Sequence, residues 1–142
     1  MKTMTTKSTC IFLALIMMFS LVSCGKTKVN DALWQNALYT QDTEFGKGNK
    51  TVQVEVKTDE YSVTFTVKTD KALLGDALLE NNLVDGENGP YGLYIKSVNG
   101  IVADYDIDQS YWAFYKDGEM MMTGVDGAEI ADGEHYELVY TK

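Results

Sequence analysis

The sequence predicts a small α+β domain of β-grasp type, in which one helix covers one face of an antiparallel or mixed sheet. Three observations predict it: two neighbouring stretches of period-two alternation, one stretch of helical spacing, and further short strands separated by glycine turns. A hairpin, then a helix, then more strands is an order typical of this fold class. The 142-residue chain shows no internal repeat, so we expect a single hydrophobic core.

The first two strands are expected at residues 51–57 and 61–67, joined by the polar turn 58–60. Each stretch alternates apolar with polar residues, which is typical of a hairpin with one buried and one solvated face. The apolar phase consists of Val52, Val54, Val56, Tyr61, Val63, Phe65 and Val67. We therefore expect Val54, Val63 and Phe65 in the core.

The period changes after Asp70, which is expected to cap a helix. One apolar stripe follows at helical spacing, formed by Leu73, Leu74, Ala77 and Leu78. Gly75 lowers the helix propensity by about 1 kcal/mol relative to alanine, but the stripe continues through it. We expect Leu74 and Leu78 to pack on the sheet.

Glycine turns divide the remaining chain into short strands. Strands are expected at 91–98, 101–105, 111–115 and 136–140, with turns at Asn99-Gly100, Asp117-Gly118 and Asp132-Gly133. Loops are expected at 45–49 and 85–90. Residues 31–39 fit either a short helix capped by Asp31 or the start of a strand.

The first 23 residues are typical of a lipoprotein signal peptide. Lys2 and Lys7 precede an apolar run that is too short to span a bilayer comfortably. The run ends in Leu21-Val22-Ser23-Cys24, which resembles a bacterial lipobox, so we expect cleavage before Cys24 and a diacylglycerol on its sulfur. Residues 24–50 would then form the lipidated cysteine and N-terminal segment, and 51–142 the domain. This places the protein on the extracytoplasmic face of the cell membrane, held there only by lipid.

Charge and cysteine content narrow the partners. The net charge is −9, and loss of the two signal lysines brings it to −11 in the mature chain. Because all twelve basic residues are lysines and the chain is anionic, nucleic acid is an unfavourable partner. Cys10 leaves with the signal peptide and Cys24 carries the lipid, so no disulfide is expected.

Residues suited to catalysis or metal binding are few, and we expect neither an enzyme nor a metal centre. His135 is the only histidine, and it fits a hydrogen-bonded structural residue better than a metal ligand or a catalytic base. The alternating acids Asp104, Asp106 and Asp108 lack the glycine and the glutamate of an EF-hand. They fit the polar face of a loop, or a weak cation site.

An aromatic cluster is the stronger indication of function. Seven aromatic residues fall within 25 positions, followed by Met120 to Met122: Tyr91, Tyr94, Tyr105, Tyr111, Trp112, Phe114 and Tyr115. Trp112 and Phe114 share one strand face, opposite Tyr111 and Tyr115. Either the cluster is core plus ordinary surface, or part of it forms a flat apolar platform for a large ligand, with methionine as adaptable packing.

This part of the chain resembles the C-terminal β domain of the transcobalamin and intrinsic factor family, and bacterial lipoproteins with a domain of the DUF4430 type. The resemblance covers residues 90–142 and rests on motifs in the family's order: Tyr91-Gly92, Ser97-Val98-Asn99, Tyr111-Trp112-Ala113-Phe114, Gly124-Val125 and Glu134-His135-Tyr136. It implies corrin contacts at Ile95, Phe114 and Met121, with Tyr91 nearby. The predicted ligand-binding set is Tyr91, Gly92, Ile95, Trp112, Phe114, Met121 and Met122.

The resemblance also implies a ligand and a partner. In that family the domain closes over one face of cobalamin while a helical barrel covers the other, and we expect no such barrel here. The ligand would be cobalamin, a related corrinoid or another flat apolar molecule, and there is no intrinsic cofactor. A second protein would complete the clamp. The alternative is a surface protein-interaction module on the same domain without corrinoid binding.

Overall fold

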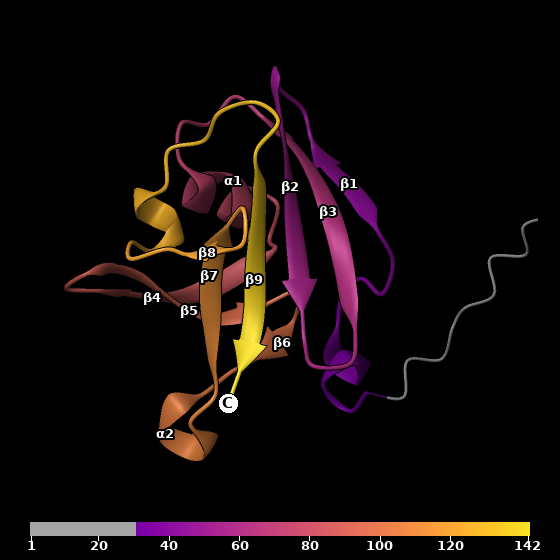
Figure 1. Cartoon of the computed structure of the whole chain (residues 1–142), viewed down its shortest axis with the longest axis vertical. Helices are drawn as coiled ribbons and strands as arrows, with labels where there is room; N and C mark the ends of the chain where they lie inside the picture. Colours follow the sequence, from indigo (N-terminus) through magenta and orange to yellow (C-terminus); the bar gives the residue numbers. More distant parts are fainter. Residues whose placement is uncertain (1–30) are drawn as a thin grey trace, which may run out of the picture.

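A six-stranded mixed sheet forms the frame of the computed structural model, which describes residues 31–142 (Figure 1). Its strands, in spatial order, are β1 (Thr43–Gly46), β3 (Ser62–Thr69), β2 (Lys50–Lys57), β9 (His135–Thr141), β7 (Tyr111–Lys116) and β8 (Glu119–Met120). The pairs β1–β3 and β2–β9 are parallel, and the other neighbours are antiparallel. The parallel pair at the centre, flanked by antiparallel strands, is the β-grasp arrangement that the sequence predicts.

A second, smaller sheet and four short helices complete the described part of the chain. The small sheet is antiparallel and contains β4 (Val84–Gly89), β5 (Gly92–Val98) and β6 (Ile101–Val102). The helices are α1 (Leu74–Glu80), α2 (Tyr105–Asp108) and the 3₁₀ helices η1 (Leu33–Asn36) and η2 (Val125–Gly127). The predicted α+β class is therefore confirmed. Within residues 31–142, no helix combines the length and apolar character needed to cross a membrane.

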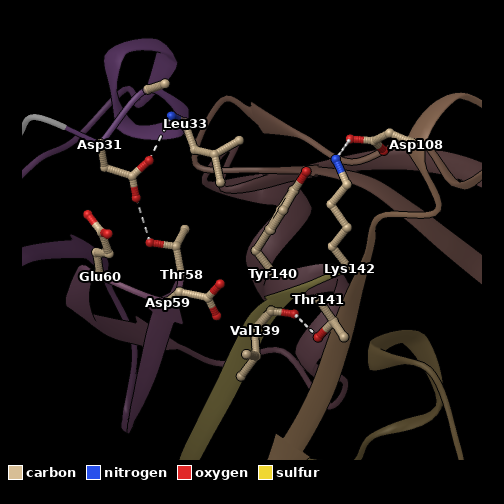
Figure 2. Close-up of a pocket in the computed structure, with 11 residues that line it drawn as sticks. Asp31, Leu33, Thr58, Asp59, Glu60, Asp108, Val139, Tyr140, Thr141 and Lys142 are labelled. Carbon is tan, nitrogen blue, oxygen red and sulfur yellow. Dashed lines mark hydrogen bonds and ion pairs between the residues drawn. The ribbon is translucent and has the colours of Figure 1, made fainter.

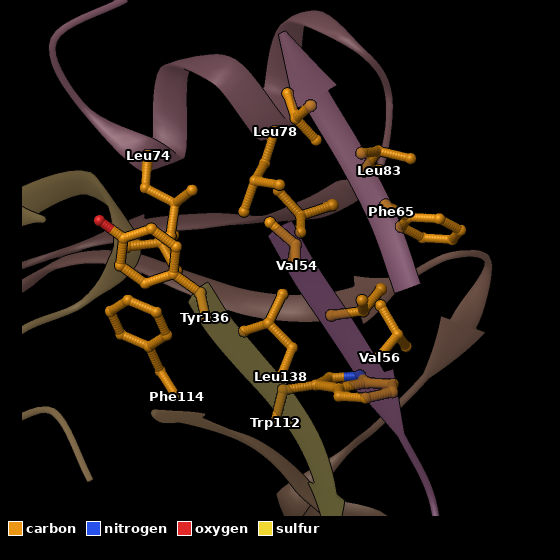
Figure 3. Packing of buried hydrophobic residues seen from close by; sticks show 14 of the residues in the cluster. Val54, Val56, Phe65, Leu74, Leu78, Leu83, Trp112, Phe114, Tyr136 and Leu138 are labelled. Atoms are coloured by element: carbon orange, nitrogen blue, oxygen red, sulfur yellow. The ribbon is translucent and has the colours of Figure 1, made fainter. Parts of the chain in front are cut away.

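The core lies between the six-stranded sheet and α1, as the alternation predicts. Val54 pairs with Phe65 across the β2–β3 hairpin, and both side chains are buried with those of Leu74 and Leu78 from α1 (Figure 3). Val63 is also buried, so all five residues expected in the core are there. Since strand residues of one phase share a face, a single buried face of the hairpin accounts for the whole alternation.

Strand β4 differs from the sequence-based expectation, which placed a loop at residues 85–90. Every residue of β4 has a partner in β5, with one irregularity between Asp85 and Gly86. A Cβ on Gly86 would lie 2.1 Å from the carbonyl oxygen of Tyr94, so only glycine fits there. An edge strand that contributes backbone hydrogen bonds needs few apolar side chains, and its glycines resemble those of a loop.

Other expected boundaries also shift. Residues Phe45 and Gly46 belong to β1 and not to a loop. Asp70 does not cap α1: its carboxylate accepts the backbone N–H of Asn49 at 2.9 Å, and the helix begins after Leu73 without a side-chain cap. The strand after Gly100 ends at Val102, because α2 follows at once with its cap on Asp104.

The N-terminal segment is tied to the domain by buried side chains. The segment is helical only over Leu33–Asn36, with Ala32 and not Asp31 at the N-cap, although Asp31 accepts the N–H of Leu33 at 2.8 Å. Trp34 is buried, and its Nε1 donates to Thr58 Oγ1 at 2.8 Å. At the predicted Asn99-Gly100 turn both residues have positive φ, and the buried Asn99 side chain bonds the N–H and the carbonyl of Tyr39.

Candidate functional site

The β4–β5 hairpin projects from the body of the domain, and the loop after β8 runs beside it (Figure 1). The carboxylate of Asp126 joins the two, because its Oδ2 accepts the N–H of Leu93 at 2.9 Å. Gly92 and Gly124 both lie against this carboxylate, since a Cβ on either would come within 3 Å of its oxygens. The hairpin tip and the loop are therefore adjacent.

We define the hairpin–loop surface by the side chains that these two segments contribute, which are Tyr91, Ile95, Met120, Met121 and Met122. Tyr91 is 98% exposed and Met122 is 95% exposed. Ile95 and Met121 are half-buried and pack against the core. Met120 is 55% exposed, so the surface has three exposed apolar side chains and two partly buried ones.

Phe114 and Trp112 belong to the core, in contrast to the other predicted site residues. Phe114 is only 8% exposed and stacks on Tyr136 at a centroid distance of 5.8 Å. The expectation that Phe114 presents apolar surface without being a core residue is wrong. Its phase on β7 places it with Trp112 on the inner face of the sheet, where β5 packs against β7 and the ring of Phe114 lies beside that of Tyr136 (Figure 3).

The structure brings three of the predicted residues together. The N–H of Met121 donates to the carbonyl oxygen of Phe114 at 2.9 Å, and Ile95 packs against the same cluster. Trp112 lies apart from them: its Nε1 donates to the carbonyl oxygen of Ile101 at 3.2 Å, and its ring meets Tyr140 edge-on. Phe114 thus belongs to the core, and Ile95 and Met121 are the members of the hairpin–loop surface that pack against that core.

The remaining aromatic residues do not extend this surface into one platform. Tyr105 and Tyr111 pack edge-to-face beside α2, with centroids 6.4 Å apart. Tyr94 is exposed on the hairpin, and Tyr115 is half-buried on the outer face of β7. The aromatic cluster therefore divides between the core, the hairpin and α2.

A cavity of about 660 Å³ lies away from the hairpin–loop surface and has an acidic lining (Figure 2). We call it the acidic groove; its charged lining consists of Asp31, Asp59, Glu60, Asp108 and Lys142. Asp108 accepts one hydrogen bond from the hydroxyl of Ser110 and another, at 2.9 Å, from the ammonium of Lys142. These bonds lower the pKa of Asp108 to about 2. A groove lined by carboxylates is unsuited to a flat apolar ligand. None of the predicted site residues lines it.

A smaller cavity of about 350 Å³ lies at the hairpin tip and is more apolar in its lining. Residues 87–94 form it, including Pro90, Tyr91, Gly92 and Leu93. Two of the predicted binding residues, Tyr91 and Gly92, therefore line a hollow at the tip. An apolar hollow next to exposed apolar side chains is a feature of ligand-binding surfaces.

The contacts of His135 and Asp104 are those of structural residues. The Nε2 of His135 lies 3.6 Å from Glu55 Oε2 on the outer face of the sheet. Asp104 caps α2 by accepting the N–H of Asp106 at 3.0 Å. Across residues 31–142, no group of three or more histidine, cysteine, aspartate or glutamate side chains is placed to hold a metal ion.

Several hydrogen bonds converge on one carboxylate, that of Glu134, in the loop before β9. One of its partners, Tyr136, stacks on Phe114. Glu134 accepts hydrogen bonds from Lys116 at 2.5 Å, from the N–H of Ala131 at 2.9 Å and from the hydroxyl of Tyr136. Burial acts to raise the pKa of Glu134, but these bonds outweigh it and lower the pKa to about 2. Burial, and then the nearby Glu134, raise the pKa of Tyr136.

Sequence reasoning did not identify Asp126 or Leu93 as site residues. A hydrogen bond from a backbone N–H to a carboxylate 33 residues away leaves no periodic pattern. The only available signal was the acid that directly follows Gly124-Val125, a pair already noted for its resemblance to the family motif.

Comparison with known proteins identifies a family and two similar structures. Residues 71–142 match the model of the family described as "Domain of unknown function (DUF4430)". No curated protein matches the sequence significantly. A crystal structure of a "putative metal binding protein" from Ruminococcus gnavus ATCC 29149 is 37% identical, with a TM-score of 0.63, and the match covers 66% of this chain and 98% of that one.

The chain is also similar in structure to haptocorrin in complex with Cbi (cobinamide). The identity is 24% and the TM-score 0.50, and the match covers 69% of this chain and 26% of haptocorrin. This likeness shows a shared fold. The chain spans about a quarter of the length of haptocorrin.

Proposed function

We propose that this chain, which belongs to the DUF4430 family, is a lipid-anchored binding protein that captures a corrinoid outside the cytoplasm. The observation that carries the proposal is the near-complete exposure of Tyr91 and Met122 on adjacent segments. Exposed apolar side chains favour a bound ligand over ordinary surface, and Tyr91 also lines the apolar hollow at the hairpin tip. The likeness to haptocorrin, which holds cobinamide, supports a corrinoid as that ligand.

The position of the hairpin tip supports an anchored role. The indigo start of the described chain lies at one side of the domain, and the tip of the β4–β5 hairpin lies at the opposite side (Figure 1). Cys24, which lies outside the described residues, is seven positions before residue 31. A lipid on Cys24 would therefore join the domain at the end of the chain that lies opposite the hairpin tip, which leaves the hairpin–loop surface open to a ligand.

The surface suits only one face of a corrin ring. Its exposed side chains belong to two short segments, and its partly buried side chains pack against the core. A ligand held on one face leaves the other in water, which lowers the buried apolar area and the affinity. We therefore include in the proposal a second protein that covers the other face of the ligand.

A protein-interaction module is the second candidate function. The hollow at the hairpin tip has a volume of about 350 Å³, which is less than that of the acidic groove. This small volume favours a partner that covers the surface over a ligand that needs an enclosed cavity. A partner protein can bury Tyr91 and Met122 without needing a deep cavity.

Calorimetric titration of the full chain in detergent with cobinamide and with cobalamin separates these functions. Corrinoid capture predicts saturable heat, and losses of about 1–2 kcal/mol in binding free energy for Tyr91→Ala and for Met122→Ala. Ile107→Ala is the matched control, because Ile107 is 82% exposed on α2, outside the hairpin–loop surface. No heat from folded wild-type protein would reject corrinoid capture by this chain alone and favour the interaction module.

The anchor has its own test. Cys24→Ala should release the protein from the membrane fraction or leave the signal peptide uncleaved, because the lipidated sulfur is lost. A mutant that matured and sedimented with membranes like the wild type would contradict the lipobox interpretation.

A further inference from the structure

Three glycines from separate parts of the chain crowd around one residue, Asp126 in η2. A Cβ on Gly92 would lie 2.3 Å from Asp126 Oδ2, and one on Gly124 would lie 2.7 Å from Oδ1. A Cβ on Gly75, in α1, would lie 2.9 Å from the Cα of Asp126. The helix, the hairpin and the loop after β8 therefore meet at Asp126, and each approaches it more closely than a side chain would allow.

The Asp126 carboxylate also provides the polar link between the hairpin tip and the loop. Strands β4 and β5 pair with each other and with β6, and not with the six-stranded sheet. Within residues 31–142, the bond from Leu93 N–H to Asp126 Oδ2 is the one hydrogen bond that joins residues 89–94 to residues 119–127. A bond from a backbone N–H to an ionised carboxylate is shorter and stronger than one to a neutral acceptor.

We propose that Asp126 is the positioning residue that sets the hairpin tip against the loop after β8 and so assembles the hairpin–loop surface. The inference rests on the proposed function in one respect, that this surface faces the ligand. Tyr91 directly precedes Gly92, and Met122 lies two residues before Gly124. Because both glycines lie against the same carboxylate, moving that carboxylate changes the spacing of Tyr91 and Met122.

The backbone at the two glycines shows which one offers a clean test. Gly92 has φ +104°, so any other residue there would be strained whatever the space. Gly124 has φ −72°, which any residue adopts. Gly124→Ala would thus push the Asp126 carboxylate aside without straining the backbone or removing the charge.

The first test is hydrogen exchange at the Leu93 amide in the full chain. Asp126→Ala should speed exchange at Leu93 roughly tenfold or more, because the acceptor is lost, while exchange at Phe65 and Leu138 in the core stays unchanged. Asp132→Ala is the matched control: Asp132 Oδ1 accepts the Thr51 N–H at 2.7 Å, in the loop before β9. Unchanged exchange at Leu93 in Asp126→Ala would overturn the proposal.

Three further variants keep the test decisive if Asp126→Ala does not fold. Gly124→Ala should expose the Leu93 amide in the same way, whereas Gly127→Ala should not, since a Cβ there meets only Thr123 at an ordinary 3.6 Å. Asp126→Asn, which keeps an oxygen acceptor, should restore most of the protection. Equal exchange in Gly124→Ala and Gly127→Ala would contradict the positioning role.

The same variants are then titrated with cobinamide. Asp126→Ala and Gly124→Ala should each weaken binding roughly tenfold, and the Asp132→Ala and Gly127→Ala controls should bind like the wild type. Faster exchange at Leu93 with unchanged affinity would overturn the role of Asp126 in assembling the binding surface. Absence of binding by the wild type would reject the proposed ligand instead, and the exchange comparison would still decide whether Asp126 positions the hairpin.

Discussion

The six-stranded sheet and the β4–β5 hairpin are built in different ways. In the sheet, eight consecutive residue pairs join β2 to β3, and five join β2 to β9, over a buried inner face. The hairpin pairs outside itself only with the two residues of β6, and its tip carries the exposed Tyr91. This difference indicates that the sheet and its buried face provide most of the stability. The candidate ligand surface lies instead on a hairpin whose tip donates a hydrogen bond to Asp126.

Phe114→Ala should have the largest effect on stability. Phe114 lies on β7 of the sheet, and its carbonyl oxygen accepts the N–H of Met121 from the hairpin–loop surface. Its ring is buried against Tyr136, so truncation leaves a cavity and should cost about 3–5 kcal/mol. Chemical denaturation measures this cost. A loss below about 1 kcal/mol would show that Phe114 is not a core residue, which would fit the corrin contact that the resemblance implies for it.

Leu78→Ala tests the packing of α1 on the sheet. Leu78 is fully buried, and the substitution should lower the free energy of unfolding by about 2–5 kcal/mol. The same denaturation experiment checks it. If the change were under about 0.5 kcal/mol, helix and sheet would not share the core described above.

Acid should weaken the sheet through Glu134. Its folded pKa of about 2 lies below the ordinary value of 4.5, so its ionised form favours the folded state. That contribution is fully present above pH 4.5 and is lost as the pH falls toward 2. Thermal melting from pH 6 to pH 2 should show a smaller loss of stability in Glu134→Gln than in the wild type. Parallel profiles for the two proteins would contradict this assignment.

Tyr91→Ala and Met122→Ala should have the smallest effect on stability. Both side chains are almost fully exposed, so their truncation should change the free energy of unfolding by less than about 0.5 kcal/mol. Denaturation curves measured with those of Phe114→Ala sharpen the contrast between hairpin and sheet. A cost above about 2 kcal/mol would show that these side chains support the fold.

The sequence was sufficient for the sheet because burial there follows a simple period. Val54, Val63 and Phe65 lie in the apolar phase of two alternating strands, and positive φ at Asn99 and Gly100 fits the predicted turn. Strand β4 was not predictable in this way. Its glycines suit close backbone pairing with β5, but in the sequence they are typical of a loop.

The candidate site could be predicted only in part, because some of its predicted residues lie at the surface and others lie in the core. Tyr91 and Met122 were expected at the surface and lie there, but Phe114 has the phase of a core residue on β7. Alternation distinguishes the two faces of a strand without showing which face the hairpin covers. Asp126 escaped notice because long-range hydrogen bonds leave no local pattern.

Hydrogen exchange of the full chain with and without cobinamide tests the central claim most directly, because it compares both regions in one experiment. The account predicts slower exchange on ligand addition at residues 89–95 and 119–124, with the sheet amides unchanged. Slower exchange instead at residues 58–60 and 139–142, around the acidic groove, would contradict the assignment of the ligand to the hairpin–loop surface.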